Sequence, residues 1–252
     1  MKSITATIVT LNEEKNIKDV IDSISDVCDE IIVVDSNSSD NTVKIAKSLG
    51  AKVYFQEWLG DGLQKDYGVQ FAKNDWILSI DADERLSENA VRAINGIDLD
   101  KTEFDAFALK RKTFIGNRWI KIWYPDYTVR LYNKNTAGYL PMREHASVQA
   151  KNSKKLNCDI LHYSYQNYSD MITRINRFST TSAKMLYEKG KKASHFDPFF
   201  HALFAFIRKF VLKRGALHGL DGFTVSMITA VSTYMKYMKL IEIRENRYKN
   251  TE

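Results

Sequence analysis

Two aspartates, Asp81 and Asp83, stand one residue apart directly after the apolar segment 76–80. Carboxylates with this spacing on a turn can meet a divalent cation and the hydroxyls of a ribose together, because Mg²⁺ and Mn²⁺ favour a few carboxylate oxygens plus substrate phosphates. An arbitrary Asp-x-Asp is more often a solvated turn. The position after a buried strand favours the functional interpretation, so we expect a cation and nucleotide site here.

Two other charged side chains stand at comparable positions. Asp35 ends the apolar run 31–34, although its alternative role is an Asx turn leading into a helix cap at Ser38 and Ser39. Lys65 follows a glycine-bearing loop and is able to neutralise a diphosphate, although an isolated lysine is more often a solvated surface residue. Both therefore join the candidate site.

Strands and helices alternate over roughly the first 100 residues, which predicts an α/β fold with a parallel sheet covered on both faces. The expected strands are 4–9, 30–35, 51–55 and 76–80, and the expected helices are about 17–24, 41–49 and 63–72. Ligands of such sheets bind outside the carboxyl ends of the strands. Asp35 and Asp81 both fall at that edge.

The pattern changes after residue 105. Segments 104–112 and 129–132 predict an antiparallel extension of the sheet rather than a new domain. From about residue 165 the chain reads as mostly helical and basic. We therefore divide it into a first domain over residues 1–164, with 1–100 as its nucleotide-binding part and 101–164 as its second part, which the resemblance described below implies is the acceptor side, and a helical extension over 165–252.

The charge is unevenly distributed. The net charge is +6, but residues 151–252 hold 18 basic and 8 acidic residues, whereas residues 1–150 hold 19 and 23. The basic C-terminal part, residues 151–252, is suited to an anionic partner such as phospholipid or nucleic acid. Segments 199–214 and 223–243 are too short or too charged to span a bilayer and resemble amphipathic helices on an anionic membrane surface. The alternative is that they pack on the main domain.

Several function classes lose their support. Cys28 and Cys158 are the two cysteines, which argues against a disulfide framework and for a reducing, cytoplasmic setting, and the short apolar N-terminus predicts no export. The chain carries neither a P-loop nor a G-x-G-x-x-G motif, and its cysteines and five dispersed histidines have no zinc spacing.

Three motifs together resemble the signature of family 2 glycosyltransferases with the GT-A fold. They are Thr-Ile-Val-Thr-Leu-Asn-Glu-Glu at 7–14, Ile-Val-Val-Asp-Ser-Asn-Ser-Ser-Asp-Asn-Thr at 32–42, and Ile-Asp-Ala-Asp-Glu at 80–84. Trp-Tyr-Pro-Asp at 123–126, Arg-Leu-Tyr at 130–132 and Leu-His-Tyr-Ser-Tyr at 161–165 resemble the lipopolysaccharide-core β-1,4-glucosyltransferases of the WaaE/LgtF type. The resemblance covers essentially the whole chain and implies a Rossmann-like, mostly parallel sheet.

The resemblance also implies how a UDP-sugar would be held. Asp35 would hydrogen-bond the uracil ring, and Thr10, Asn12 and Glu13 would line the nucleoside pocket. Lys65 would lie by the phosphates or the uracil. These residues are the expected donor-binding set.

The remaining assignments concern the metal and the base. Asp81 would contact the ribose side, and Asp83 would hold the Mg²⁺ or Mn²⁺ that bridges the diphosphate. Relatives carry a general base in a Val-His-Glu-like triplet, where this chain has Met-Arg-Glu-His at 142–145. Glu144 matches the acid, and His145 is the competing candidate because the histidine follows it.

The expected activity is transfer of a hexose, glucose from UDP-glucose, to a heptose of the lipopolysaccharide inner core. One base and no second nucleophile imply a single displacement with inversion. The implied partners are the UDP-sugar, the lipid A-core acceptor and an anionic membrane surface, with no nucleic acid, at the inner face of the cytoplasmic membrane. The alternatives are a capsule or exopolysaccharide acceptor, or a non-catalytic membrane- or nucleic-acid-binding protein.

Overall fold

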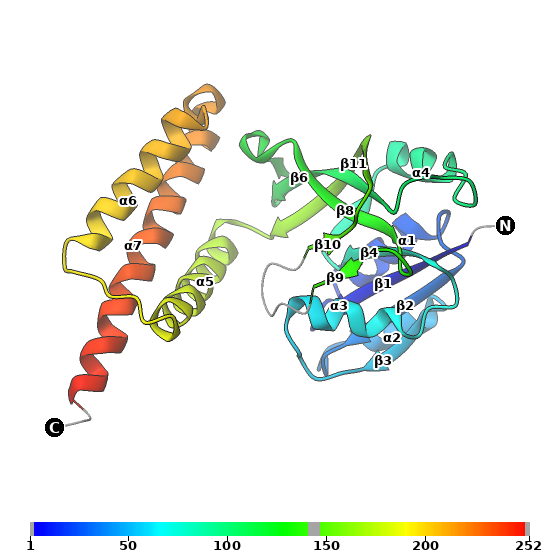
Figure 1. The fold of residues 1–252 in the computed structure, drawn as a ribbon, viewed down its shortest axis with the longest axis horizontal. Helices are drawn as coiled ribbons and strands as arrows, with labels where there is room; N and C mark the ends of the chain where they lie inside the picture. Colours follow the sequence, from blue (N-terminus) through cyan, green and yellow to red (C-terminus); the bar gives the residue numbers. More distant parts are fainter. Residues whose placement is uncertain (1–2, 141–146, 250–252) are drawn as a thin grey trace. The chain divides into compact units, whose positions relative to one another are not determined.

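The computed structural model describes residues 3–140 and 147–249, with side chains described to residue 245. The chain divides into two compact units (Figure 1). The first comprises Met1–Phe114 and Tyr124–Ser164, and the second comprises Ile115–Trp123 and Tyr165–Glu252. The short segment Ile115–Trp123, which the sequence analysis placed on the acceptor side of the first domain, is thus grouped with the C-terminal helices.

The first unit begins with a parallel sheet in the order β3-β2-β1-β4. Its strands are β1 (Ile4–Thr10), β2 (Glu30–Asp35), β3 (Lys52–Phe55) and β4 (Trp76–Asp81). Each crossover carries a helix, α1 (Ile17–Ile24), α2 (Thr42–Ser48) or α3 (Asp61–Val69). The predicted alternation of strands and helices is confirmed, with ends that differ by a few residues.

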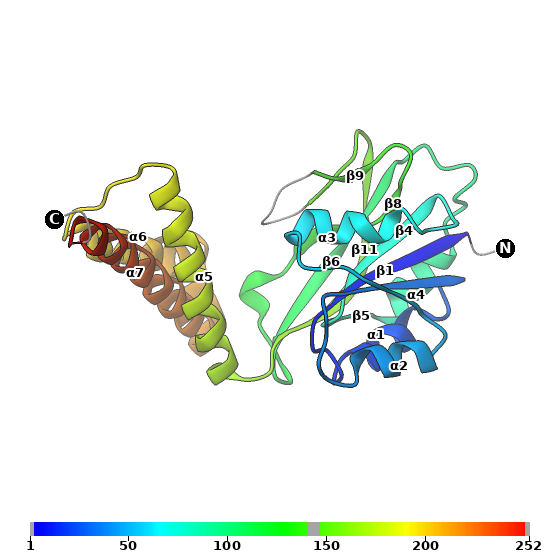
Figure 2. The same cartoon turned by 90° about the horizontal axis from the view of Figure 1, so that it is seen from below.

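Helices cover both faces of this sheet (Figure 2). On one face, the apolar stripe of α1 packs with Ala46 of α2 and with Ala6 and Ile8 of β1, and α4 (Glu88–Asn95) joins the same core. On the other face, α3 packs on β1 and β2 so closely that a Cβ on Gly68 would lie 3.0 Å from the Val34 side chain. The near-continuous apolar character of β1 and β2 follows from burial on both faces.

An antiparallel extension continues the sheet beyond β4, as expected, in the order β8-β6-β11-β5. Its strands are β5 (Glu84–Leu86), β6 (Ala106–Ile115), β8 (Asp126–Asn133) and β11 (Ser153–Tyr165). The strand β9 (Gly138–Tyr139) pairs with β10 (Val148–Gln149) in a small separate sheet. Strand β8 pairs antiparallel with β4, so residues of the extension lie directly beside the parallel half of the sheet.

The second unit is mainly helical. It contains β7 (Arg118–Trp119), a 3-10 turn (Lys121–Trp123), α5 (Tyr168–Glu188), α6 (Asp197–Ile207) and α7 (Gly219–Lys249), with a π turn (Arg208–Leu212) and a 3-10 turn (Gly215–His218) between the last two helices. Gly215 and Gly222 approach so closely that a Cβ on Gly222 would lie 1.8 Å from the Gly215 oxygen. Among the described residues, no helix is long and apolar enough to cross a membrane.

The centre of β1 should dominate the stability of the first unit. Ile8 is fully buried in the main core, whereas Leu11, just beyond the strand, is about half exposed. We expect Ile8→Ala to lower the free energy of unfolding by about 3 kcal/mol, because it leaves a cavity, and Leu11→Ala to lower it by less than about 1 kcal/mol. Urea unfolding followed by near-ultraviolet circular dichroism measures both. Equal losses in the two variants would contradict this packing.

Candidate functional site

The carboxyl ends of three neighbouring strands bring the predicted residues to one edge of the sheet. Thr10 at the end of β1 is in register with Asp35 at the end of β2, and Val9 is in register with Asp81 at the end of β4. The chain crosses from β1 to β2 on one side and later returns to β4 on the other side of β1. Open α/β sheets bind ligands at such a switch point.

Asp35 lies in a preorganised hydrogen-bond arrangement. The Thr10 hydroxyl donates to its Oδ2 over 2.8 Å, the Ser38 hydroxyl donates to the same oxygen over 2.6 Å, and the Ser38 amide donates to Oδ1 over 2.8 Å. The residue is 3% exposed. The Asx-turn role that the sequence left open is therefore present. Because a carboxylate oxygen has two lone pairs, Oδ1 has capacity for one further donor.

Asn12 and Glu13 join the loop after β1 to the loop after β2. Asn12 has a left-handed backbone with φ 57°, and its side-chain oxygen accepts a hydrogen bond of 2.8 Å from the Ser39 amide. The Glu13 amide donates to the Thr42 hydroxyl over 2.7 Å, and its carboxylate accepts from Asn16. These contacts fix the two loops beside Asp35, while a direct role in lining a nucleoside pocket stays a prediction.

Asp81 is held by two cations. Its Oδ1 lies 2.7 Å from the Lys65 ammonium, and its Oδ2 lies 2.7 Å from the Arg130 guanidinium. Arg130 also contacts the fully buried Glu84 over 2.6 Å, and Glu84 in turn accepts from the Asp81 amide over 3.2 Å. Lys65, Asp81, Glu84 and Arg130, from α3, β4, β5 and β8, therefore form the centre of one charge network. Asp61 adds an ion pair of 3.4 Å with Lys65, and Arg111 adds one of 3.9 Å with Glu84.

The network sets the charge states of its members. Burial by itself would raise the pKa of the Asp81 carboxyl, but Arg130 and Lys65 outweigh it and hold that pKa well below its usual range. Burial by itself would lower the pKa of the Lys65 ammonium, but the Asp81 carboxylate raises that pKa above its ordinary value. Asp81 is therefore ionised and Lys65 protonated throughout the physiological pH range.

Asp83 lies next to a histidine that sequence reasoning had set aside. Its Oδ2 is 3.4 Å from Nε2 of His162, and Nδ1 of that ring is 3.4 Å from the Thr113 hydroxyl. His162 reaches this position because β11 pairs with β5, with His162 opposite Glu84. Two cations engage the oxygens of Asp81, whereas the Asp83 contact is to a ring nitrogen, so Asp83 has the better oxygen for a metal.

The described residues contain no group of three or more His, Cys, Asp or Glu side chains arranged for a metal ion. Mg²⁺ and Mn²⁺ at phosphate-binding sites commonly take one or two protein carboxylates and complete their coordination with substrate phosphates and water. Asp83, with the His162 imidazole beside it, fits such a cation. Glu144 and His145, the two candidates for the base, lie outside the described residues.

Sequence reasoning missed Arg130, Glu84 and His162 as members of the site. Arg130 had been noted only within the motif at 130–132, and its signal was an arginine between two apolar residues of a predicted strand. A charged residue in such a buried strand must be paired. Neither Glu84 nor His162 carried such a signal, because their partners come from strands far away in the sequence.

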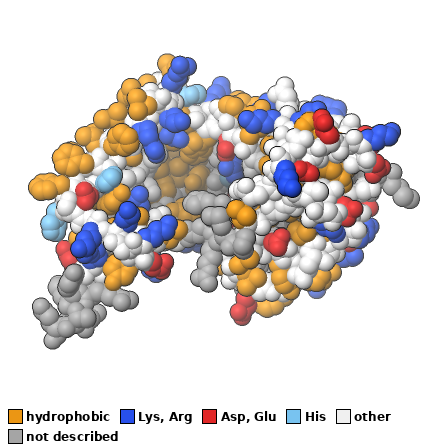
Figure 3. Space-filling model, in the orientation of Figure 1, with side chains coloured by type: hydrophobic (Ala, Val, Ile, Leu, Met, Phe, Trp, Pro, Cys, Tyr) orange, Lys and Arg blue, Asp and Glu red, His pale blue; other side chains and the backbone are white. Residues whose placement is uncertain are grey.

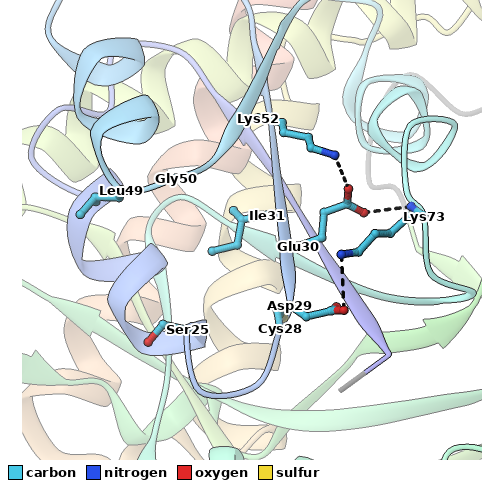
Figure 4. A pocket seen from close by; sticks show the side chains of 9 residues that line it. All are labelled: Ser25, Cys28, Asp29, Glu30, Ile31, Leu49, Gly50, Lys52 and Lys73. Atoms are coloured by element: carbon cyan, nitrogen blue, oxygen red, sulfur yellow. Dashed lines mark hydrogen bonds and ion pairs between the residues drawn. The ribbon is translucent and has the colours of Figure 1, made fainter. Parts of the chain in front are cut away.

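A cavity of about 280 Å³ lies elsewhere, at the amino-terminal end of β2 (Figure 4). There the Glu30 carboxylate accepts hydrogen bonds from the Lys52 ammonium, the Lys73 amide and the Thr5 hydroxyl over 2.7–2.9 Å. Glu30 and Asp35 are opposite ends of β2, about 17 Å apart at strand spacing. This cavity is therefore separate from the candidate site.

Comparisons with known proteins agree on a family. A family model described as glycosyl transferase family 2 matches residues 5–215. An uncharacterised glycosyltransferase of Rickettsia typhi is 35% identical over 96% of this chain and 88% of its own length. The lipopolysaccharide core biosynthesis glycosyltransferase LpsC of Rhizobium meliloti is 24% identical over 95% of this chain and 92% of its own.

Among solved structures, residues 1–349 of S. aureus TarS align over 98% of this chain and 92% of that one, with 14% identity and a TM-score of 0.49. The mixed sheet, its antiparallel extension and the helical C-terminal region define a glycosyltransferase of GT-A-like fold, as the resemblance implied. Because the family model covers most of the sequence, the chain belongs to glycosyl transferase family 2.

The Asp81 network gives a pH-dependent prediction. Lys65→Met removes one cation from Asp81, and we expect it to lower the free energy of unfolding at pH 7 by about 2 kcal/mol. Lys65 helps to hold the folded-state pKa of Asp81 below its usual range, so that pKa should rise in the variant, and the folded variant should take up a proton at Asp81 at a higher pH than the folded wild type does. As the pH falls, protonation of Asp81 therefore costs the variant less stability than it costs the wild type. The difference in free energy of unfolding between the two proteins should then narrow.

Urea unfolding at pH 7 and at pH 3 measures that difference. Lys44→Met, at an exposed lysine of α2, is the matched control and should behave as the wild type at both values. If the free energies of unfolding of the wild type and of Lys65→Met differ by the same amount at both pH values, the Lys65–Asp81 pair does not contribute to stability through its charge.

Proposed function

We propose that this protein is an inverting, metal-dependent glycosyltransferase that moves glucose from UDP-glucose to a heptose of the lipopolysaccharide inner core. The observation that carries the donor half of the proposal is the convergence of Asp35, Asp81 and Asp83 at the carboxyl edge of the sheet. Family membership supports sugar transfer. The acceptor rests on the motifs of residues 123–165 and on the relative named for lipopolysaccharide core biosynthesis.

The donor would bind with its uracil at Asp35 and its ribose at Asp81. The free lone pair on Asp35 Oδ1 suits an imide N–H of the base, and Thr10 with Ser38 fixes the carboxylate toward it. Lys65 and Arg130 fix Asp81, and Lys65 adds positive charge where a diphosphate would lie. Residues 1–100, together with Arg130 and His162 from the extension, would thus hold the donor, and the rest of 101–164 would receive the acceptor.

Asp83, with His162 beside it, would hold Mg²⁺ or Mn²⁺. When bound, the cation supplies Lewis-acid stabilisation of the leaving diphosphate. Glu144 would accept the proton of the attacking acceptor hydroxyl, and His145 is the alternative base. A single displacement by that hydroxyl inverts the anomeric centre, so an α-linked donor gives a β-linked product. A membrane-linked acceptor and a cytosolic donor place the reaction at the inner face of the cytoplasmic membrane.

The metal role of Asp83 is separable from donor binding. UDP with Mn²⁺ should raise the melting temperature of the wild type, because both bind the folded state. In Asp83→Asn we expect the Mn²⁺-dependent part of that shift to vanish, the shift with UDP alone to persist, and transfer to fall by about 10³-fold or more. Asp100→Asn, at an exposed aspartate, is the control. Turnover like that of the wild type in Asp83→Asn would remove the metal argument.

The base is identified by kinetics on the proposed acceptor. With UDP-glucose and a heptose-terminated core oligosaccharide, Glu144→Gln should lower kcat by about 10³-fold while the UDP-dependent thermal shift stays unchanged. His145→Gln should lose less than about tenfold. The reverse order would make His145 the base. A panel of UDP-sugars and of capsule and exopolysaccharide fragments serves as the counter-test, since faster transfer to one of these would replace the proposed acceptor.

A further inference from the structure

The helical unit carries a long apolar surface that its own packing leaves exposed. We name it the apolar face: it comprises the exposed large apolar side chains of α6, of the turns after it and of α7. Its members are Phe196, Phe199, Phe200, Leu203, Phe204, Ile207, Val211, Leu212, Leu217, Leu220, Phe223, Met227, Val231, Tyr234 and Met238. In Figure 3, hydrophobic side chains gather along the outer edge of α6. A large number of exposed large apolar side chains on neighbouring helices is typical of an interaction site.

The face follows from helical spacing on two packed helices. From Phe196, which precedes α6, through Leu203 to Ile207 at its end, the exposed members recur at intervals of three and four residues, while Pro198 and Ala205 are buried. Helix α7 packs against both α5 and α6. Its exposed members recur in the same way from Leu220 to Met238. The buried sides hold the helices together, so the exposed stripes are not needed for that contact.

Positive charge borders the apolar face. Residues 189–240 hold nine lysines and arginines and two acidic residues. Both acidic residues are used inside the unit: Asp197 accepts from the Ser194 amide over 2.6 Å, and Asp221 pairs with Arg118 over 2.7 Å. Arg208 and Lys213, at the start and just after the end of the π turn that follows α6, are exposed. The rim therefore presents cations to whatever covers the face.

We infer that the apolar face binds the surface of a bilayer containing anionic phospholipid, with α6 lying along the interface. The aromatic and aliphatic side chains would enter the boundary between headgroups and acyl chains, and the cations would meet lipid phosphates. The eleven residues of α6 extend about 16 Å, about half a hydrocarbon core, which suits an orientation in the interface plane. A second copy of this chain is disfavoured as the occupant because its own cationic rim would face the first.

This inference deepens the proposed function by naming the surface that would bring the enzyme to a lipid-linked acceptor, but it uses none of the donor-site residues. Its test therefore needs no UDP-sugar. The full chain is incubated with vesicles of phosphatidylethanolamine and phosphatidylglycerol, or of phosphatidylcholine alone, and the bound fraction is measured by flotation. The wild type should float with the anionic vesicles, at least tenfold more than with the neutral ones, and less so at high salt.

Two pairs of variants separate the apolar and the charged contributions. Phe204→Glu, at a residue 59% exposed, should lower partitioning by at least tenfold, whereas Phe55→Glu, at a residue of the first unit 58% exposed, should leave it unchanged. Arg208→Gln with Lys213→Gln should lower partitioning to anionic vesicles by about tenfold, whereas Lys44→Gln with Lys47→Gln should not. Circular dichroism establishes that each variant is folded, and the UDP-dependent thermal shift establishes that the variants of the helical unit keep an intact donor site.

Three results would overturn the inference. The wild type could stay unbound in the presence of anionic vesicles, or Phe204→Glu could float as well as the wild type. The wild type could also be a dimer by light scattering at micromolar concentration, with Phe204→Glu a monomer, in which case a second copy covers the face. Loss of sugar transfer with vesicle binding intact would count against the proposed function alone.

Discussion

The candidate site depends on one charge arrangement, the partly exposed carboxylate of Asp81 held between the buried side chains of Lys65 and Arg130. A carboxylate in this position is costly to desolvate, and only opposite charges at hydrogen-bond distance make it tolerable. Lys65 comes from α3 on one face of the parallel sheet, and Arg130 comes from β8 in the antiparallel extension. The interaction therefore links the two halves of the sheet where the nucleotide would bind.

The same arrangement gives different contacts to two aspartates that the sequence cannot tell apart by type. Asp81 has both oxygens directed at cations, so it suits hydrogen bonding to a neutral hydroxyl. Asp83 lies two residues further along the chain, where its Oδ2 contacts the imidazole of His162. The difference arises because β8 lies next to β4 whereas β11 lies next to β5. Neighbouring strands, rather than neighbouring residues, thus set the chemistry of each carboxylate.

The helical unit differs from the first unit in the large apolar side chains that it leaves exposed. Its helices bury one side against each other and leave large aromatic and aliphatic side chains outside, with cations beside them. Burying those side chains within the unit would stabilise it, so their exposure is a cost to the isolated protein. The first unit shows much less of this, since most of its large apolar residues lie in the sheet cores. The two units therefore differ in how much large apolar surface they leave exposed.

Much of the first unit was predictable from local pattern. The apolar runs at 31–34 and 76–80 and the amphipathic spacing of α1 act over a few residues, so they identify strands, helices and the edge at which Asp35 and Asp81 end their strands. The motifs that resemble the family are equally local. What the sequence determined by itself was the order of the elements, the fold class and which carboxylates share one rim of the sheet.

Only the tertiary structure decided what those carboxylates contact. Arg130 is 49 residues from Asp81, and His162 is 79 residues from Asp83, and no periodicity connects residues so far apart. Their meeting depends on the order β4-β8-β6-β11-β5, which is fixed by the packing of whole strands. The exposure of the apolar stripes was undecided for the same reason, because an amphipathic pattern states which side of a helix is apolar and leaves open what covers it.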